Sequence, residues 1–231
     1  MLLAIDVGYI NLGYCILSKD QISFGIRQLN EPINRESIIL KSKTKNKSLN
    51  WNLIINNLIT FMDTLPIQIS APIDNTTENN VSENNTTDND TSENDTSELD
   101  KPCISKLVIE RQMNIAPNNL MIQSAVMTYW ISKTKTNEIA RNITHDSKDD
   151  NLIIFDPRLK FKYTEVEYDS KKKEHKRLSI RFALKLLMKW FPNRVNDFQM
   201  FGKKDDIADA IVMAFMNADW LDFDEVKARL R

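Results

Sequence analysis

The sequence has few of the residues that define several large classes of protein. Among its 231 residues are two cysteines, two histidines and four glycines, and no apolar run of the roughly 20 residues that a membrane span needs. Cys15 and Cys103 are too few for a disulfide framework and are typical of a reducing compartment. The chain begins with an apolar strand and not with a signal peptide, so we expect an intracellular protein that is not bound to a membrane.

One segment has almost no apolar residues. Residues 74–100 consist mainly of Asn, Thr, Ser, Asp and Glu, and they cannot bury enough apolar surface to offset the entropy lost on ordering. We therefore predict one domain over residues 1–231, with a disordered acidic insertion at 74–100. The insertion has nine acids and no Lys or Arg, so the net charge of −1 for the whole chain becomes +8 for the rest. A basic folded part is typical of proteins that bind nucleic acid.

The remaining sequence predicts an α/β fold. Apolar runs bounded by polar or turn residues predict five strands, at 2–7, 12–17, 22–29, 106–110 and 152–155. Apolar residues at helical spacing predict four helices, at 49–65, 118–140, 172–190 and 205–220. The order is three strands, then helix, strand, helix, strand and two helices.

Acidic residues stand at the ends of two predicted strands and on the last predicted helix. Asp6 and Glu110 each follow a short apolar run, whereas Asp206 and Asp209 share one helix face near its start, where the helix dipole favours acids. Clustered carboxylates repel one another unless a hard divalent cation binds them. In two-metal sites such cations hold the attacking and leaving oxygens of a displacement at phosphorus. The pattern therefore indicates phosphodiester chemistry with Mg²⁺ or Mn²⁺.

Each acid also has an ordinary structural explanation. Strands ending in Asp-x-Gly are common, and Asp205 and Asp206 are candidates to cap the last helix, with Asp209 on its solvated face. Actin-like ATPases and sugar kinases also open with Asp-x-Gly, but such folds need a second phosphate-binding loop and a more glycine-rich chain. The order of the three motifs together favours the catalytic interpretation.

Three segments together resemble motifs of the RuvC-type Holliday junction resolvases of the RNase H-like superfamily. They are Ile5-Asp6-Val7-Gly8, Val108 to Gln112 and Asp206 to Ala210. The run Lys203 to Asp209 is most similar to the poxvirus branch. The resemblance implies an RNase H-like mixed sheet of five strands, flanked by helices, with a three-strand antiparallel meander and two parallel strands. It also implies a homodimer that cuts four-way and other branched DNA by symmetric paired nicks and leaves 5′-phosphates. The wide apolar surface of helix 118–140 is then expected to be mostly core and partly subunit interface.

The resemblance assigns roles to six residues. The expected metal ligands are Asp6, Glu110, Asp206 and Asp209. They would hold two Mg²⁺ ions per site, and Mn²⁺ can substitute for Mg²⁺. Lys160 and Lys176 are the expected lysines near the scissile phosphate, where they would neutralise charge as the phosphate reacts. The basic run around Lys176 also fits a solvated or generally DNA-binding face. No histidine and no organic cofactor is assigned.

The biological setting follows from the resemblance and the composition. The poxvirus-like motifs and the Asn-, Ile- and Lys-rich sequence of an A+T-rich genome indicate a large DNA virus that resolves genome concatemers in the host cytoplasm. A fungal mitochondrial resolvase is the second choice, disfavoured because there is no Arg-rich, acid-poor leader. Two other functions stay open: an RNase H-type nuclease on RNA:DNA hybrids, which would share the acids and the sheet, and a non-catalytic junction-binding protein.

Overall fold

The computed structural model describes residues 1–30, 49–67, 103–113, 116–139, 151–162 and 172–222. The acidic insertion predicted at 74–100 lies outside these ranges. None of the helices within them combines the length and apolar composition needed to cross a bilayer.

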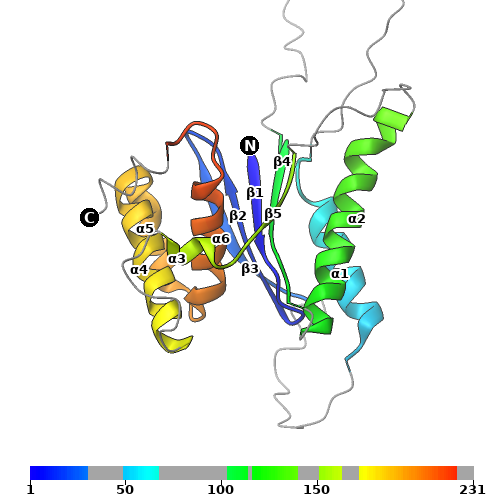
Figure 1. Ribbon diagram of the computed structural model, residues 1–231, viewed down its shortest axis with the longest axis horizontal. Coiled ribbons are helices and arrows are strands. Elements are labelled where there is room, and N and C mark those ends of the chain that lie inside the picture. The colour runs from blue at the N-terminus through cyan, green and yellow to red at the C-terminus, as the bar shows by residue number, and fades with distance from the viewer. Residues whose placement is uncertain (31–48, 68–102, 114–115, 140–150, 163–171, 223–231) are drawn as a thin grey trace, which may run out of the picture.

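A five-stranded mixed sheet forms the centre of the molecule (Figure 1). Its spatial order is β3-β2-β1-β4-β5. The first three strands form an antiparallel meander, and β4 and β5 add to β1 in parallel. The predicted fold class is therefore confirmed, and each strand lies within one residue of its predicted bounds: β1 Leu2–Asp6, β2 Asn11–Leu17, β3 Ile22–Gln28, β4 Lys106–Glu110 and β5 Leu152–Phe155.

Helices cover both faces of the sheet (Figure 1). On one face lie α1 (Trp51–Asp63) and α2 (Pro117–Ile139), and on the other lie α4 (Lys172–Trp190), α5 (Val195–Met200) and α6 (Lys204–Met216). Alternate strand residues enter the two cores, because successive side chains point to opposite faces of a sheet. Leu3 and Ile5 of β1 pack toward α1 and α2, whereas Leu2 and Ala4 pack toward α4 and α6. Burial on both faces explains why β1 is an uninterrupted apolar run.

Short helical turns are the elements that the sequence did not predict. They are α3 (Leu159–Lys162), the 3₁₀ turn η3 (Pro192–Arg194) and α5. Elements this short offer too few residues for a helical period to show. The last helix also ends at Met216 and not at Trp220, because the Asn217 carboxamide donates a 2.8 Å hydrogen bond to the Met213 carbonyl and ends the helix there.

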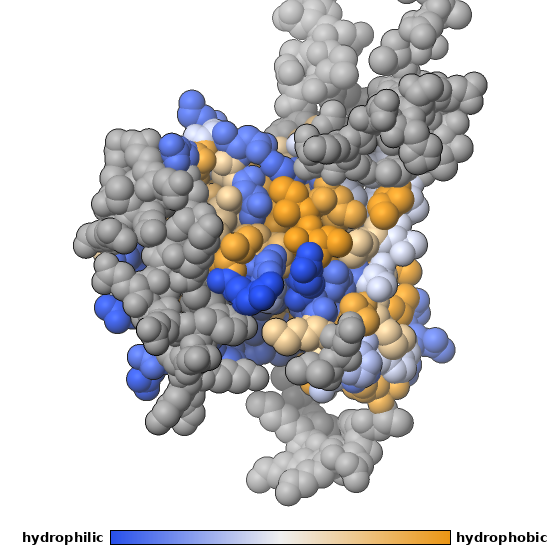
Figure 2. Space-filling model, viewed as in Figure 1, coloured by the Kyte–Doolittle hydropathy of each residue, from blue (hydrophilic) through white to orange (hydrophobic). Residues whose placement is uncertain are grey.

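The parallel edge of the sheet is partly open to solvent. Figure 2 shows apolar side chains gathered over β5, with hydrophilic side chains where this strand ends. Ile154 at the middle of this edge is 40% exposed. From the end of β5 the chain turns at Asp156, whose carbonyl accepts a 2.9 Å hydrogen bond from the Leu159 amide, and enters α3. This turn brings Lys160 back over the ends of the strands.

Candidate active site

Parallel pairing brings two of the predicted acids together at one edge of the sheet. In the β1–β4 ladder Ile5 is paired with Ile109, so the next residues, Asp6 and Glu110, are neighbours. The two carboxyl groups lie close enough that the charge of Glu110 adds to the effect of burial and raises the pKa of Asp6. Because residues 2–5 of β1 and 107–109 of β4 are apolar, each acid is the first polar side chain after a buried run.

A glycine allows α6 to bring a third acid to this edge. Gly13 of β2 is paired with Asp6, and a Cβ atom on Gly13 would lie 2.4 Å from the carbonyl oxygen of Asp206. The first turn of α6 therefore packs directly against the strand. Asp206 lines the same pocket as Asp6 as a result. Neither Asp205 nor Asp206 is the N-cap of α6, which is Lys203.

Replacing Gly13 with alanine is expected to push the start of α6 off the sheet and to move Asp206 away from Asp6. Overpacking of this kind costs roughly 1–3 kcal/mol of unfolding free energy. Chemical denaturation of Gly13→Ala beside Gly202→Ala measures it, because a Cβ at Gly202 meets nothing within 4 Å. Equal stability of the two variants would contradict the close packing described for Gly13.

A buried lysine occupies the centre of the acidic cluster. The side chain of Lys160 is 2% exposed, and its Nζ lies 2.7 Å from Glu110 Oε1 and 3.1 Å from Asp209 Oδ2. Burial alone would lower the pKa of Lys160, but the carboxylates of Asp209, Glu110 and Asp6 outweigh it and raise the pKa above its ordinary value. The structure therefore links β4, α3 and α6 through one ammonium group, which stays charged at any physiological pH.

The acids differ in their preferred protonation state. Burial raises the pKa of Asp6 well above its ordinary value, and the nearby charge of Glu110 adds to the effect. Burial acts in the same direction on Glu110 and is the largest single effect, but the charge of Lys160 and the hydrogen bonds to Glu110 together outweigh it, so the pKa of Glu110 is lowered. Burial also raises the pKa of Asp206, despite its contact with Lys203. Of these two neighbouring carboxyls, Asp6 therefore binds a proton more readily than Glu110 does.

Two further lysines lie at the rim of the cluster. Lys203 pairs with Asp206, and Lys176 of α4 pairs with Asp205. Both lysine side chains are about half exposed, whereas the two acids are about 16–17% exposed. The hydrogen bond to Asp205 raises the pKa of Lys176. Of the two lysines singled out from the sequence, Lys160 contacts the predicted acids directly, and Lys176 contacts their neighbour Asp205.

A chain of side-chain amides supports the site, and the sequence analysis missed it. Gln112 donates to the Glu110 carbonyl and to Glu110 Oε2 at 3.4 and 3.5 Å. Asn119 of α2 donates to Gln112 Oε1 at 3.1 Å, and its own Oδ1 accepts from the Tyr9 amide at 3.1 Å. The turn after β1 is thereby tied to Glu110. Gln112 stood within a recognised motif, but nothing in the sequence pointed to Asn119.

The donor set fits a hard divalent cation. Asp6, Glu110, Asp206 and Asp209 offer only oxygen atoms, the ligands that Mg²⁺ and Mn²⁺ take. Asp209 Oδ1 is buried and has no hydrogen-bond partner among the described residues, so it is free to accept one more contact. Within the same ranges, no three or more Asp, Glu, His or Cys side chains are arranged so that they could hold a metal ion together. Instead, Lys160 holds two of the four carboxylates, so its ammonium and a metal ion would compete for the same oxygens.

Comparison of the chain with models of protein families, with characterised proteins and with solved structures gave no match.

Proposed function

We propose that the protein is a divalent-metal-dependent endonuclease that cuts four-way and other branched DNA, as its resemblance to the RuvC-type resolvases implies. One observation carries the proposal. Three acids from separate elements, Asp6, Glu110 and Asp209, converge with the buried Lys160 where β1 and β4 end. Holding a buried lysine among partly buried acids is costly for stability, and sites of this kind are functional candidates.

The four predicted acids would hold the metal, Mg²⁺ or Mn²⁺, with two ions per site. Bound there, the ions supply an activated water and stabilise the leaving oxygen at the scissile phosphate. Asp6 neighbours Glu110 on the next strand and lines a pocket with Asp206, so it would contribute a ligand beside each of these acids. Its proton must leave before it can act in that role.

The lysines supply positive charge to the phosphate. An ammonium group near a reacting phosphoryl group stabilises the charge that develops in the transition state. Lys160 is fixed by its burial, whereas Lys176 and Lys203 are half exposed beside Asp205 and Asp206, where a DNA backbone can reach them. Contacts to backbone phosphates give affinity without sequence information.

The exposed surface of α2 supports a homodimer. Ile122, Val126 and Trp130 are buried, as expected for the core. Leu120, Met121 and Ile131 remain 36–50% exposed on the same helix. A two-fold dimer would present two equivalent sites to the two strands of a junction. Paired nicks of this kind, which leave 5′-phosphates, would resolve viral genome concatemers in the host cytoplasm.

Cleavage of an immobile four-way DNA junction by purified protein with Mg²⁺ tests the proposal. We expect symmetric paired nicks that Asp209→Asn reduces by at least about 10²-fold, the scale for removing one electrostatic group from an active site. The matched control is Asp197→Asn, because Asp197 lies on α5 and pairs with Arg194. Cutting of an RNA:DNA hybrid alone would move the assignment to an RNase H-type nuclease, and junction binding without cutting would indicate a structural junction binder.

A further inference from the structure

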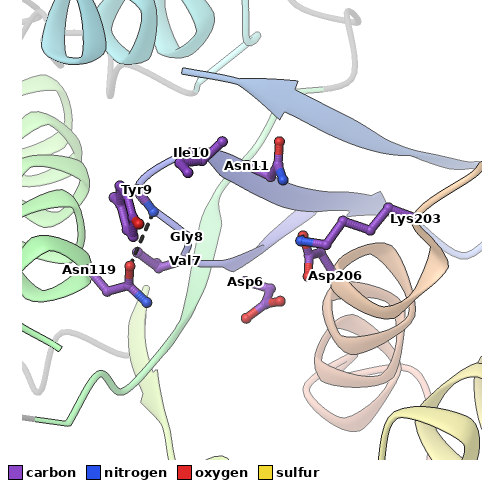
Figure 3. Close-up of a pocket in the computed structure, with 9 residues that line it drawn as sticks. All are labelled: Asp6, Val7, Gly8, Tyr9, Ile10, Asn11, Asn119, Lys203 and Asp206. Carbon is purple, nitrogen blue, oxygen red and sulfur yellow. Dashed lines mark hydrogen bonds and ion pairs between the residues drawn. The ribbon is translucent and has the colours of Figure 1, made fainter. Parts of the chain in front are cut away.

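The pocket that Asp6 and Asp206 line extends beyond these acids to the turn that follows β1. Its volume is about 300 Å³, at the lower end of the range for ligand pockets. Figure 3 shows Tyr9 and Asn119 on one side, Lys203 and Asp206 on the other, and Asp6 between them. The pocket is therefore continuous with the proposed catalytic centre but made largely of residues that have no part in holding metal.

The wall of this pocket is built from the turn between β1 and β2. Gly8 makes the turn possible, because a Cβ atom there would lie 2.4 Å from the Asn11 carbonyl oxygen. The turn exposes Ile10, which is 36% exposed, and Tyr9 is partly buried against the core beside it. An apolar and aromatic surface of this kind is where a nucleobase stacks.

Two asparagines line the pocket, and they are not equivalent. The Asn119 carboxamide is used on both sides, since its Oδ1 accepts from the Tyr9 amide and its Nδ2 donates to Gln112. The Asn11 carboxamide makes no hydrogen bond to any residue within the described part of the chain, and Asn11 is one of the residues that line the pocket (Figure 3). Asn119 thus fixes the wall, whereas Asn11 keeps a donor and an acceptor for a ligand.

We propose that this pocket is a nucleotide subsite that takes the base next to the scissile phosphate, with Asn11 as the residue that discriminates between bases. The inference rests on the proposed function, because the proposed metal ligands Asp6 and Asp206 line this pocket together with the half-exposed Lys203. A carboxamide pairs through both its donor and its acceptor with one base edge, and with adenine above all. The base must leave its stack to enter, and strands at a branch point are already partly unstacked.

The hydrogen-bonded chain gives this subsite a route to the catalytic acids. A base bound in the pocket would contact the turn at Tyr9. Asn119 and Gln112 connect this turn to Glu110 through hydrogen bonds. A correctly held base therefore steadies the Glu110 carboxylate, and a poorly held base does not. Asn119 is accordingly a positioning residue, distinct from Asn11, which touches the base.

The subsite is tested with a pool of four-way junctions whose sequence is randomised around the branch point. The pool is cut to low conversion, and the ends of the products are sequenced. Wild-type protein should favour one base at one position beside the cut. The Asn11→Ala variant should reduce that preference about 5-fold or more, the scale of one bidentate base contact, whatever its effect on the overall rate. The Lys203→Gln variant should slow all sequences alike. The matched control Asn193→Ala, an exposed asparagine on η3, should leave the profile unchanged.

The outcomes separate the subsite from the proposed function. If the wild type cleaves junctions and Asn11→Ala leaves the base preference beside the cut unchanged, the subsite alone is overturned. Absence of cleavage by the wild type overturns the proposed function, and the subsite is then decided by NMR. Titration of the four nucleoside 5′-monophosphates should shift the Asn11 side-chain amide signals with at least one base and leave those of Asn193 in place. No shift with any of the four would overturn the subsite.

Discussion

The Lys160→Met variant should melt well below the wild type when divalent metal is absent. Removal of one partner of a buried ion pair typically costs about 3–5 kcal/mol, because it leaves a buried charge without compensation. At about 2–4 °C per kcal/mol for a domain of this size, the loss should be roughly 6–20 °C. The methionine keeps most of the side-chain volume, so the loss reports charge and not packing. Thermal unfolding followed by circular dichroism measures it.

Mg²⁺ should recover most of this loss, and the recovery is the sharper part of the prediction. A bound cation between Glu110 and Asp209 replaces the missing ammonium, so the variant should gain more from Mg²⁺ than the wild type does. The deficit should also shrink as the pH falls, because the unpaired carboxylates can then be protonated. Lys106→Met is the matched control, since Lys106 pairs with the exposed Asp219 and should lose no more than about 1 kcal/mol. An equal effect of Mg²⁺ on all three proteins would contradict the central place of Lys160.

The Asp6→Asn variant should have the opposite effect on stability while it abolishes cleavage. Because the pKa of Asp6 is raised in the folded protein, its ionised form is disfavoured there. This group therefore destabilises the fold increasingly as the pH rises from its ordinary pKa of 3.8 to the raised value, and the penalty stays constant above that. The asparagine cannot ionise, so the metal-free variant should melt a few degrees above the wild type at pH 7.

Three further measurements belong to the same variant. Its advantage over the wild type should shrink toward pH 4, where Asp6 holds its proton. Addition of Mg²⁺ should reverse the order of the two melting temperatures, because the wild type keeps all four ligands. Cleavage should fall by at least about 10²-fold. A metal-free Asp6→Asn protein that melts below the wild type at pH 7 would show that burial of this carboxyl is not costly.

The strands and the acids were predictable because their signals are local. An apolar run such as 2–5 fixes a buried strand, and the acid that follows it must lie at the end of that strand. Helical spacing in the same way placed Asp206 and Asp209 on one face of α6. The register that sets Asp6 beside Glu110 also follows once the two strands are parallel neighbours.

The supporting contacts were not predictable, because they join residues far apart in the chain. Lys160 meets Glu110 across 50 residues, and Asn119 meets Tyr9 across 110. Nothing in the run 156–160 shows that its lysine is buried, since lysines are almost always exposed. The role of Gly13 is equally hidden, because it depends on how closely α6 approaches.

The central claim is that the acidic cluster binds a divalent metal ion. Diffraction from crystals soaked in Mn²⁺ tests this most directly, because the anomalous signal of Mn²⁺ locates the ion. The account predicts Mn²⁺ bounded by the carboxylates of Asp6, Glu110, Asp206 and Asp209, with Lys160 Nζ moved away from at least one of its two partners. Asp6→Asn crystals under the same conditions should show a weakened or missing peak. Wild-type crystals with no Mn²⁺ at these acids, and with Lys160 still held between Glu110 and Asp209, would contradict a metal-dependent nuclease.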